Sequence, residues 1–253
     1  MDNVSLSDHF SQYFDIFLAD TPELKKEVFK IRYRVYCQEL GYEPIENFPD
    51  QMERDSYDNR SIHCILRHKP TGIYAGCVRL VLSNSLTKEE SFPFENVCHK
   101  HSFDFNHTPR KNIAEISRLA VISQFRKRSG EENTPTGLIV FNEQNNQTIQ
   151  DQQRRSSVIA LSLYLAATSI GLNLGLSHAV TLMEPRLARH LKMRGLIAHP
   201  IGKSINFHGR RGPFVMEKHE ILDGFSKNTE IYCLFKKIQG NMGDNISDKF
   251  CSA

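Results

Sequence analysis

Two ionisable residues stand inside an apolar stretch of the chain, where burial would make each of them costly. Glu115 and Arg118 lie among isoleucine, leucine and valine residues in segment 115–122, whose alternation is typical of a strand. A charged side chain in such a place needs an ion-pair partner or a chemical task. Because the two residues are three apart, a regular strand would point them to opposite faces. We therefore predict either a β-bulge that brings both to one side or two separate roles.

Two further arginines interrupt apolar patterns in the same way. Arg79 lies within the apolar segment 76–82, and Arg32 lies on the inner face of the first predicted long helix. A buried guanidinium group requires a carboxylate, which Asp55 and Asp58 can supply. Taken singly, each charged residue is more simply explained by a structural ion pair. Together, the six favour an electrostatically tuned pocket: Arg32, Asp55, Asp58, Arg79, Glu115 and Arg118.

The elements that must position these side chains follow from hydrophobic periodicity and turn signals. Their order indicates an α/β fold, in which helices flank one mixed central sheet. We expect one domain at 12–238, with a polar insertion at about 129–153 and tails at 1–11 and 239–253. The predicted strands are 13–18, 63–67, 74–82, 115–122, 177–183, 198–207 and 214–218. The predicted helices are 22–41, 94–97, 156–172 and 185–194, and the pattern leaves 231–238 untyped.

Composition narrows the class of protein. The chain has 253 residues, 40% of them hydrophobic, and a net charge of +3, which is typical of a globular protein in water. The charge is too small to favour nucleic acid, and basic and aromatic residues do not interleave in any stretch. The six cysteines form no C-x-x-C pair, which favours reduced thiols and a cytoplasmic location. The most apolar run, 158–170, is shorter than the roughly 20 residues of a membrane span.

The charged residues follow an order and spacing that resembles the acyl-homoserine-lactone synthases. The chain is more similar still to their relatives, the N-acyl amino acid synthases, and to acyltransferases associated with PEP-CTERM/exosortase systems, over about 14–225. This resemblance implies a GNAT-like fold and transfer of a long-chain fatty acyl group from acyl carrier protein to the amine of an amino acid. It rests on the pattern Arg32-x-x-x-Tyr36, Tyr42, Asp55-x-x-Asp58, Gly76-x-x-Arg79 and Glu115-x-x-Arg118, and on stretches 19–24, 32–37, 114–121, 183–185 and 207–209.

One departure from the lactone synthases bears on the acceptor. Those enzymes carry a tryptophan near their adenosylmethionine site, where this chain has Tyr42, and this chain contains no tryptophan. The departure favours an amino acid acceptor. A lactone synthase that uses S-adenosylmethionine, and a non-catalytic module that binds acyl chains or acyl carrier protein, remain the alternatives.

Amide formation requires a neutral amine and stabilisation of the thioester oxygen. We predict that Glu115 accepts the amine proton, with Arg118 and Arg79 completing the catalytic set. Arg32 or another buried arginine would bind the carboxylate of the acceptor. The remaining predicted substrate-binding residues are Tyr36, Tyr42, Asp55, Asp58 and His208, of which the two aspartates would orient the arginines or bind the ammonium group.

The resemblance also implies how the donor is held. Backbone N–H groups of Leu119, Ala120 and Val121 would hydrogen-bond the pantetheine arm or the oxyanion. The basic triplet Arg126, Lys127 and Arg128 would contact the phosphate of an acidic acyl carrier protein, although such a cluster alone is equally explained as a solvated loop. We expect the acyl-phosphopantetheine thioester as co-substrate, with coenzyme A as an open alternative, and no bound cofactor. A lipid product would bring peripheral membrane contact. The spacing of Cys98, His99 and His101 fits no standard zinc pattern, so we predict no metal site.

Overall fold

A computed structural model describes residues 5–83, 91–126 and 147–243, with the backbone alone at 147–157. One eight-stranded mixed sheet organises them, in the order β1-β2-β3-β4-β5-β8-β6, with β7 paired to β8. The pair β4–β5 is parallel, and every other pair is antiparallel. The strands are β1 (Phe14–Leu18), β2 (Ser61–His68), β3 (Tyr74–Leu82), β4 (Ile113–Val121), β5 (His178–Met183), β6 (His199–Pro200), β7 (Ile205–Asn206) and β8 (Arg210–Glu217).

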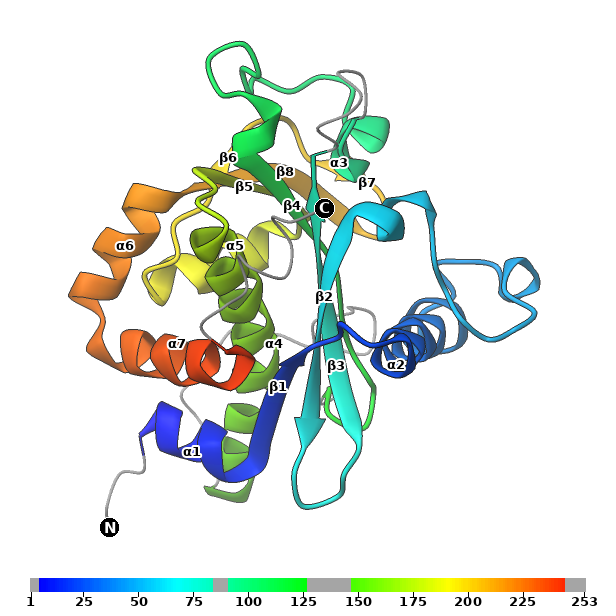
Figure 1. Ribbon diagram of the computed structural model, residues 1–253, viewed down its shortest axis with the longest axis vertical. Helices are drawn as coiled ribbons and strands as arrows, with labels where there is room; N and C mark the ends of the chain where they lie inside the picture. The colour runs from blue at the N-terminus through cyan, green and yellow to red at the C-terminus, as the bar shows by residue number, and fades with distance from the viewer. Residues whose placement is uncertain (1–4, 84–90, 127–146, 244–253) are drawn as a thin grey trace.

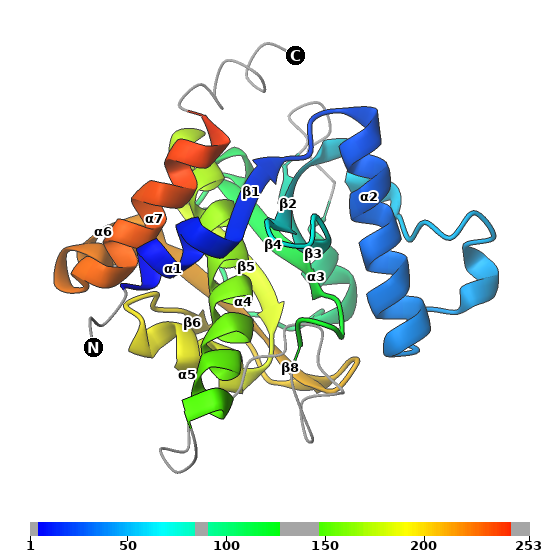
Figure 2. The ribbon, with the colours of Figure 1, turned by 90° about the horizontal axis from the view of Figure 1, so that it is seen from below.

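Helices cover both faces of this sheet, so the predicted α/β class with a mixed central sheet is confirmed (Figure 1). Figure 2 shows α2 on one side of the strands and α1, α4, α5, α6 and α7 on the other. The short helix α3 packs on the α2 side, where Phe94 joins Val81 and Ile113 in a third core cluster. The helices are α1 (Leu6–Tyr13), α2 (Pro22–Arg32), α3 (Pro93–Val97), α4 (Gln147–Asn173), α5 (Pro185–Met193), α6 (Lys218–Lys227) and α7 (Thr229–Met242). None of the described helices is long and apolar enough to cross a membrane.

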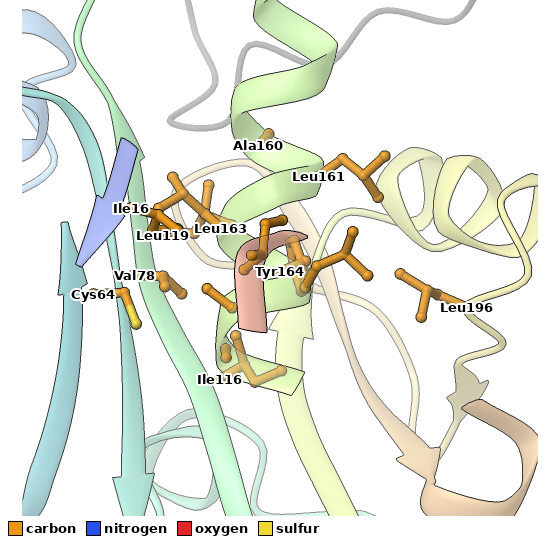
Figure 3. Packing of buried hydrophobic residues seen from close by; sticks show 14 of the residues in the cluster. Ile16, Cys64, Val78, Ile116, Leu119, Ala160, Leu161, Leu163, Tyr164 and Leu196 are labelled. Carbon is orange, nitrogen blue, oxygen red and sulfur yellow. The ribbon is translucent and has the colours of Figure 1, made fainter. Parts of the chain in front are cut away.

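The largest core cluster lies between the sheet and α4. Its side chains alternate along the strands, as the period of two requires, and meet the apolar middle of the helix. Figure 3 shows Val78 and Leu119 from the sheet facing Leu163 and Tyr164 of α4. A smaller cluster on the opposite face joins α2 to the sheet through Val28 and other side chains. The two clusters hold the central strands on both sides.

The helix predicted from Pro22 to Gly41 begins as expected and then changes its hydrogen bonding. The Oγ1 atom of Thr21 accepts the Leu24 N–H at 3.3 Å, and proline occupies the first turn. A π-helix follows at Tyr33–Glu39 (η1), and the chain turns at Gly41, whose φ is 61°. The wider turn carries Tyr36 over β4, where its hydroxyl donates to the Leu119 carbonyl at 2.9 Å.

Several predicted boundaries were wrong. The tail expected at 1–11 contains the start of α1, because Phe10 is fully buried in the main core and anchors that helix. Helix α4 begins at Gln147, within the predicted insertion, and 127–146 lie outside the described residues. The untyped segment is α7, which runs past the boundary predicted at 239. The strand predicted at 198–207 is two short strands, β6 and β7.

The predicted β-bulge is present in β4. Cys77 of β3 pairs with Ala120 while Arg79 pairs with Ser117, so β4 carries one extra residue at this point. Arg118 has a φ of 49°, in the left-handed region that side chains other than glycine rarely adopt. Such a conformation persists only where the surrounding structure enforces it.

Gly76 makes room for this bulge. A Cβ atom at position 76 would lie 2.7 Å from the backbone oxygen of Ala120, which is too close for any side chain. We expect Gly76→Ala to lower the free energy of unfolding by about 1–3 kcal/mol, measured by urea denaturation. In the matched control Gly171→Ala, the nearest atom to the new Cβ is Leu176 Cδ1 at 3.8 Å, and the helical position should gain about 0.5–1 kcal/mol. Equal stability of the Gly76→Ala variant and the native protein would contradict this account.

Candidate active site

A cleft opens where the central parallel strands separate. β4 and β5 pair only from Ile113 with His178 to Glu115 with Val180. Beyond Glu115 a space of about 420 Å³, which includes its open mouth, lies between the two strands. We call it the β4–β5 cleft. Its walls are residues 116–119 of β4, residues 181–184 at the end of β5, and Tyr36, Tyr164, Leu187 and Arg211.

Beside the cleft, two arginines are fully buried in a network with three carboxylates. Arg32 donates from Nε to Glu53 Oε2 at 2.5 Å and from Nη1 to Asp58 Oδ1 at 2.6 Å. Arg79 donates from Nη1 to Asp58 Oδ1 at 2.8 Å and to Asp55 Oδ1 at 2.5 Å. Burial alone would raise the pKa values of Glu53 and Asp58, but the arginines more than offset it and lower both. Glu53 and Asp58 therefore stay ionised.

A short 3₁₀-helix, η3 (Ser56–Arg60), aims the two aspartates at these arginines. Asp55 is its N-cap, and Asp55 Oδ1 accepts the Tyr57 N–H at 2.9 Å. Asp58 Oδ2 in turn accepts the Asp55 N–H at 2.8 Å. This reciprocal capping box holds both carboxylates in the orientation in which they bind the two guanidinium groups.

Arg118 links the network to the cleft. The bulge turns its side chain toward the acids, where Nε lies 3.1 Å from Glu53 Oε1 and Nη2 lies 3.3 Å from Asp55 Oδ2. It also lies over the Tyr36 ring, 5.5 Å from the centroid. Its side chain is 24% exposed, against 0% for Arg32 and Arg79, so it is the network arginine that reaches the cleft. A second link is the hydrogen bond from Arg79 Nε to Ser117 Oγ, at 3.1 Å.

Glu115 lies outside the cleft lining, and its hydrogen-bond partner is a backbone group of α3. It lies at the last paired position before the cleft and is not among the lining residues. Its Oε2 atom accepts the Phe94 N–H at 2.9 Å. Burial raises the pKa of Glu115 to about 8, although Phe94 N–H and the charges of Arg79 and Arg118 oppose the rise. The carboxyl group is therefore protonated at neutral pH, and its role as proton acceptor stays a prediction.

Tyr42 and His208 come together above the cleft but do not line it. Their rings stack at 4.4 Å between centroids. His208 lies in the turn between β7 and β8 with a φ of 50°, and its Nε2 atom is 4.0 Å from Glu43 Oε1. Burial, aided by Arg211 and Arg118, lowers the pKa of His208. The contact joins the C-terminal part of the sheet to the loop after η1.

The predicted donor-binding residues are used in different ways. Leu119 lines the cleft, while Ala120 and Val121 pair with β3. Arg126 is nearly buried and its guanidinium group forms an ion pair with Glu39. The same carboxylate accepts the N–H and the hydroxyl of Ser123, at 3.0 and 2.8 Å. The charge of Arg126 is thus already matched within the protein. The other two predicted basic residues, Lys127 and Arg128, lie outside the described part of the chain.

Sequence reasoning missed four residues that complete the site. Glu53 bridges Arg32 and Arg118 from an acidic loop with no periodicity to mark it. Tyr164, in the apolar middle of α4, forms a hydrogen bond with the Thr181 side chain, and burial raises the pKa of Tyr164 to about 12. Glu184 and Arg211 lie on the cleft wall at the ends of β5 and β8. The signal for Glu184 was its place directly after an apolar strand, before a proline.

The buried thiols and histidines form no second centre in the described residues. Burial raises the pKa of Cys37 to about 11 and that of Cys77 to about 12, so neither thiol is activated. No group of three histidine, cysteine, aspartate or glutamate side chains within 5–83, 91–126 and 158–243 is arranged to hold a metal ion.

Comparisons with known proteins agree with this geometry. A family model described as an acetyltransferase (GNAT) domain matches residues 31–134. The crystal structure of TofI in a ternary complex with an inhibitor and MTA is 20% identical, covers 84% of this chain and 96% of its own, and has a TM-score of 0.57. BjaI, a CoA-dependent acyl-homoserine lactone synthase with SAM and isopentyl-CoA bound, is 17% identical, covers 85% and 89%, and has a TM-score of 0.53.

A third solved structure widens the range of chemistry found on this fold. FeeM, an N-acyl amino acid synthase from uncultured soil microbes, is 11% identical, covers 87% of this chain and 97% of its own, and has a TM-score of 0.55. No curated protein matches the sequence. The matched domain, the similar structures and the separation of β4 from β5 show that the chain has a GNAT-like fold.

Proposed function

We propose that the protein is an N-acyltransferase that moves a long-chain fatty acyl group from acyl carrier protein to the amine of an amino acid. The observation that carries the proposal is the β4–β5 cleft, where the open edge of β4 meets charged side chains and the Tyr164 hydroxyl. FeeM and BjaI, which share the fold, are named for acyl transfer to nitrogen-bearing acceptors, and the former supports an amino acid acceptor. The link to exosortase systems rests on sequence stretches alone and stays a prediction.

The cleft suits an extended thioester arm. Beyond Glu115 the β5 side of β4 has no strand partner among the described residues, so its backbone groups are available to hydrogen-bond a pantetheine arm laid beside it. A second hollow of about 330 Å³, a volume that includes open solvent at its mouth, lies further along the same face of β4, lined by Ala114, Ala167 and Leu172 among others. Ala114 and cleft-lining Ile116 share that face, so an acyl tail that leaves the cleft on this side would run toward these apolar side chains.

The direct test is an assay of the purified protein with acyl carrier protein thioesters of several chain lengths and a mixture of amino acids. We expect N-acyl amino acids by mass spectrometry, together with free thiol. Acyl-CoA donors run in parallel decide between the two carriers. Lactone formation with S-adenosylmethionine would instead favour the synthase alternative, and carrier binding without thiol release would favour a binding module. Absence of amide product at every chain length would refute the proposal.

Tyr164 is the proposed acid for the leaving thiolate. Its raised pKa keeps the hydroxyl protonated, and it lines the cleft. We expect Tyr164→Phe to lower kcat by about 10²-fold, the lower end of the usual effect of a general acid. Loss of its hydrogen bond with Thr181 should cost only about 1 kcal/mol of stability. Steady-state kinetics and thermal unfolding measure the two effects, with exposed Tyr232→Phe as the control. A kcat within twofold of the native value would remove Tyr164 from this role.

A further inference from the structure

Glu184 and Arg211 lie near one another at one end of the cleft but form no ion pair. Met183 of β5 pairs with Gly212 of the antiparallel strand β8, so Glu184, which follows Met183, lies across from Arg211, which precedes Gly212. Residues directly opposite in an antiparallel pair have Cβ atoms about 4.5–5.5 Å apart. Both side chains line the β4–β5 cleft, yet no salt bridge joins them within 4.0 Å. Their charged ends therefore diverge.

Neither charge is neutralised elsewhere in the described part of the chain. The Glu184 side chain does not cap α5, which follows it, and it makes no hydrogen bond or ion pair with a described residue. Arg211 contacts the Tyr42 side chain, through a hydrogen bond and from over its ring at 5.8 Å, but it has no carboxylate partner there and its buried Nε atom has no acceptor. Arg118, by contrast, is matched by Glu53 and Asp55. Among described lining residues, Glu184 is the only carboxylate.

The two charges also lie within electrostatic reach of the Tyr164 hydroxyl. Burial is the main cause of the high pKa of Tyr164, and Arg211 and Glu184 act on it with opposite signs. The same two residues act in the same way on the pKa of Tyr42. A guanidinium group, a carboxylate and the Tyr164 hydroxyl thus line the same cleft.

An unmatched cation and an unmatched anion in one partly buried cleft are complementary to a zwitterion. We propose that the acceptor is an α-amino acid bound across this gap, with its carboxylate on Arg211 and its ammonium group on Glu184. The assignment rests on the proposed function and adds to it the residues that select the acceptor. A simple amine would leave the Arg211 charge without an anionic partner, so we expect an amino acid to be preferred.

Glu184 is then the proposed proton acceptor. One ammonium proton passes to the Glu184 carboxylate and on to solvent, and the neutral amine attacks the thioester carbonyl carbon. A C–N bond forms, the C–S bond breaks, and the thiolate takes the Tyr164 proton. Tyr164 recovers a proton from the acylated nitrogen, which keeps its last one as the amide N–H. Atoms and charge balance with one proton released.

Binding tests the assignment without turnover. Calorimetric titration with each proteinogenic amino acid, in the presence of an S-hexadecyl pantetheine thioether that lacks the reactive carbonyl, should reveal a bound acceptor. Arg211→Gln and Glu184→Gln should each raise its Kd at least tenfold. The charge-matched controls Arg210→Gln, on the exposed neighbour, and Glu217→Gln, at the far end of β8, should not. Equal losses in variants and controls, or no binding by the native protein, would overturn the assignment.

Steady-state kinetics distinguish the proposed role of Arg211, which binds the acceptor carboxylate, from that of Glu184, which accepts the amine proton. Arg211→Gln should raise KM for the amino acid at least tenfold and leave KM for its decarboxylated amine unchanged. Glu184→Gln should lower kcat about 10²-fold, with recovery as pH rises and the amine loses its proton in solution. Equal KM changes for both acceptors, or unchanged turnover in Glu184→Gln, would overturn the assignment while the transferase proposal stood. Amino acid binding that depends on both residues without amide formation would refute the transferase proposal and leave the binding assignment intact.

Discussion

Replacing Arg32 by leucine should lower the free energy of unfolding by about 3–5 kcal/mol, the usual cost of removing one partner from a buried ion-pair network. Arg32 is fully buried and bonds both Glu53 and Asp58. Its loss leaves two carboxylates short of a positive charge in a region that water does not reach. Urea denaturation at pH 7, followed by circular dichroism, measures the change.

The same variant should show an altered dependence on pH. In the native protein the pKa values of Glu53 and Asp58 are lowered, so their contribution to stability is present above their unfolded pKa values and is lost as pH falls. Without Arg32 this contribution shrinks, so the gap between variant and native protein should be largest at neutral pH and should narrow as pH falls below the unfolded values of 4.5 and 3.8. Arg34→Leu is the control, because its ion pair with Glu39 is half-exposed and should be worth less than about 1 kcal/mol. Equal losses in both variants would contradict a buried network.

The charged residues that interrupt apolar segments were predictable because the cost of burying a charge is local. Arg32 and Arg79 each stand where the hydrophobic period requires an apolar side chain, and the structure joins them through Asp58. The bulge was predictable for a similar reason, since the spacing of Glu115 and Arg118 conflicts with a period of two. The pairing of particular carboxylates with particular arginines was not predictable, and no sequence pattern marked Glu53 as a member of the network.

The cleft itself depends on tertiary structure, and sequence patterns do not encode it. Glu184 and Arg211 lie across from one another because β8 pairs with β5 in a particular register, and Tyr164 lines the same cleft because α4 packs on that face of the sheet. In the sequence Tyr164 is one apolar position among many in a core helix. Helix α1 was missed for the same reason: Phe10 is buried by the packing of α1 against α7, an element far away in the chain.

The protein has two candidate proton acceptors, Glu184 in the cleft and Glu115 outside its lining, and Glu115→Gln distinguishes them. Burial raises the pKa of Glu115 from 4.5 to about 8, so the native protein loses stability as pH rises between these values, by up to about 5 kcal/mol. Below pH 4.5 the group is neutral in both states and costs nothing. Glutamine is neutral at every pH and keeps an oxygen for the Phe94 N–H. We expect the variant to match the native protein near pH 4.5 and to exceed it in unfolding free energy near pH 8.

Glu95 supplies a control of opposite sign. Its carboxylate bonds both Arg110 and the Phe92 N–H, and its pKa is lowered, so Glu95→Gln should lose about 1–3 kcal/mol at pH 7 and less at pH 4. Urea titrations across this pH range compare the three proteins. Turnover of Glu115→Gln then decides the chemistry: a rate near the native value fits a protonated structural carboxyl and leaves Glu184 as the base. A loss of about 10²-fold without a loss of stability would return the proton-accepting role to Glu115.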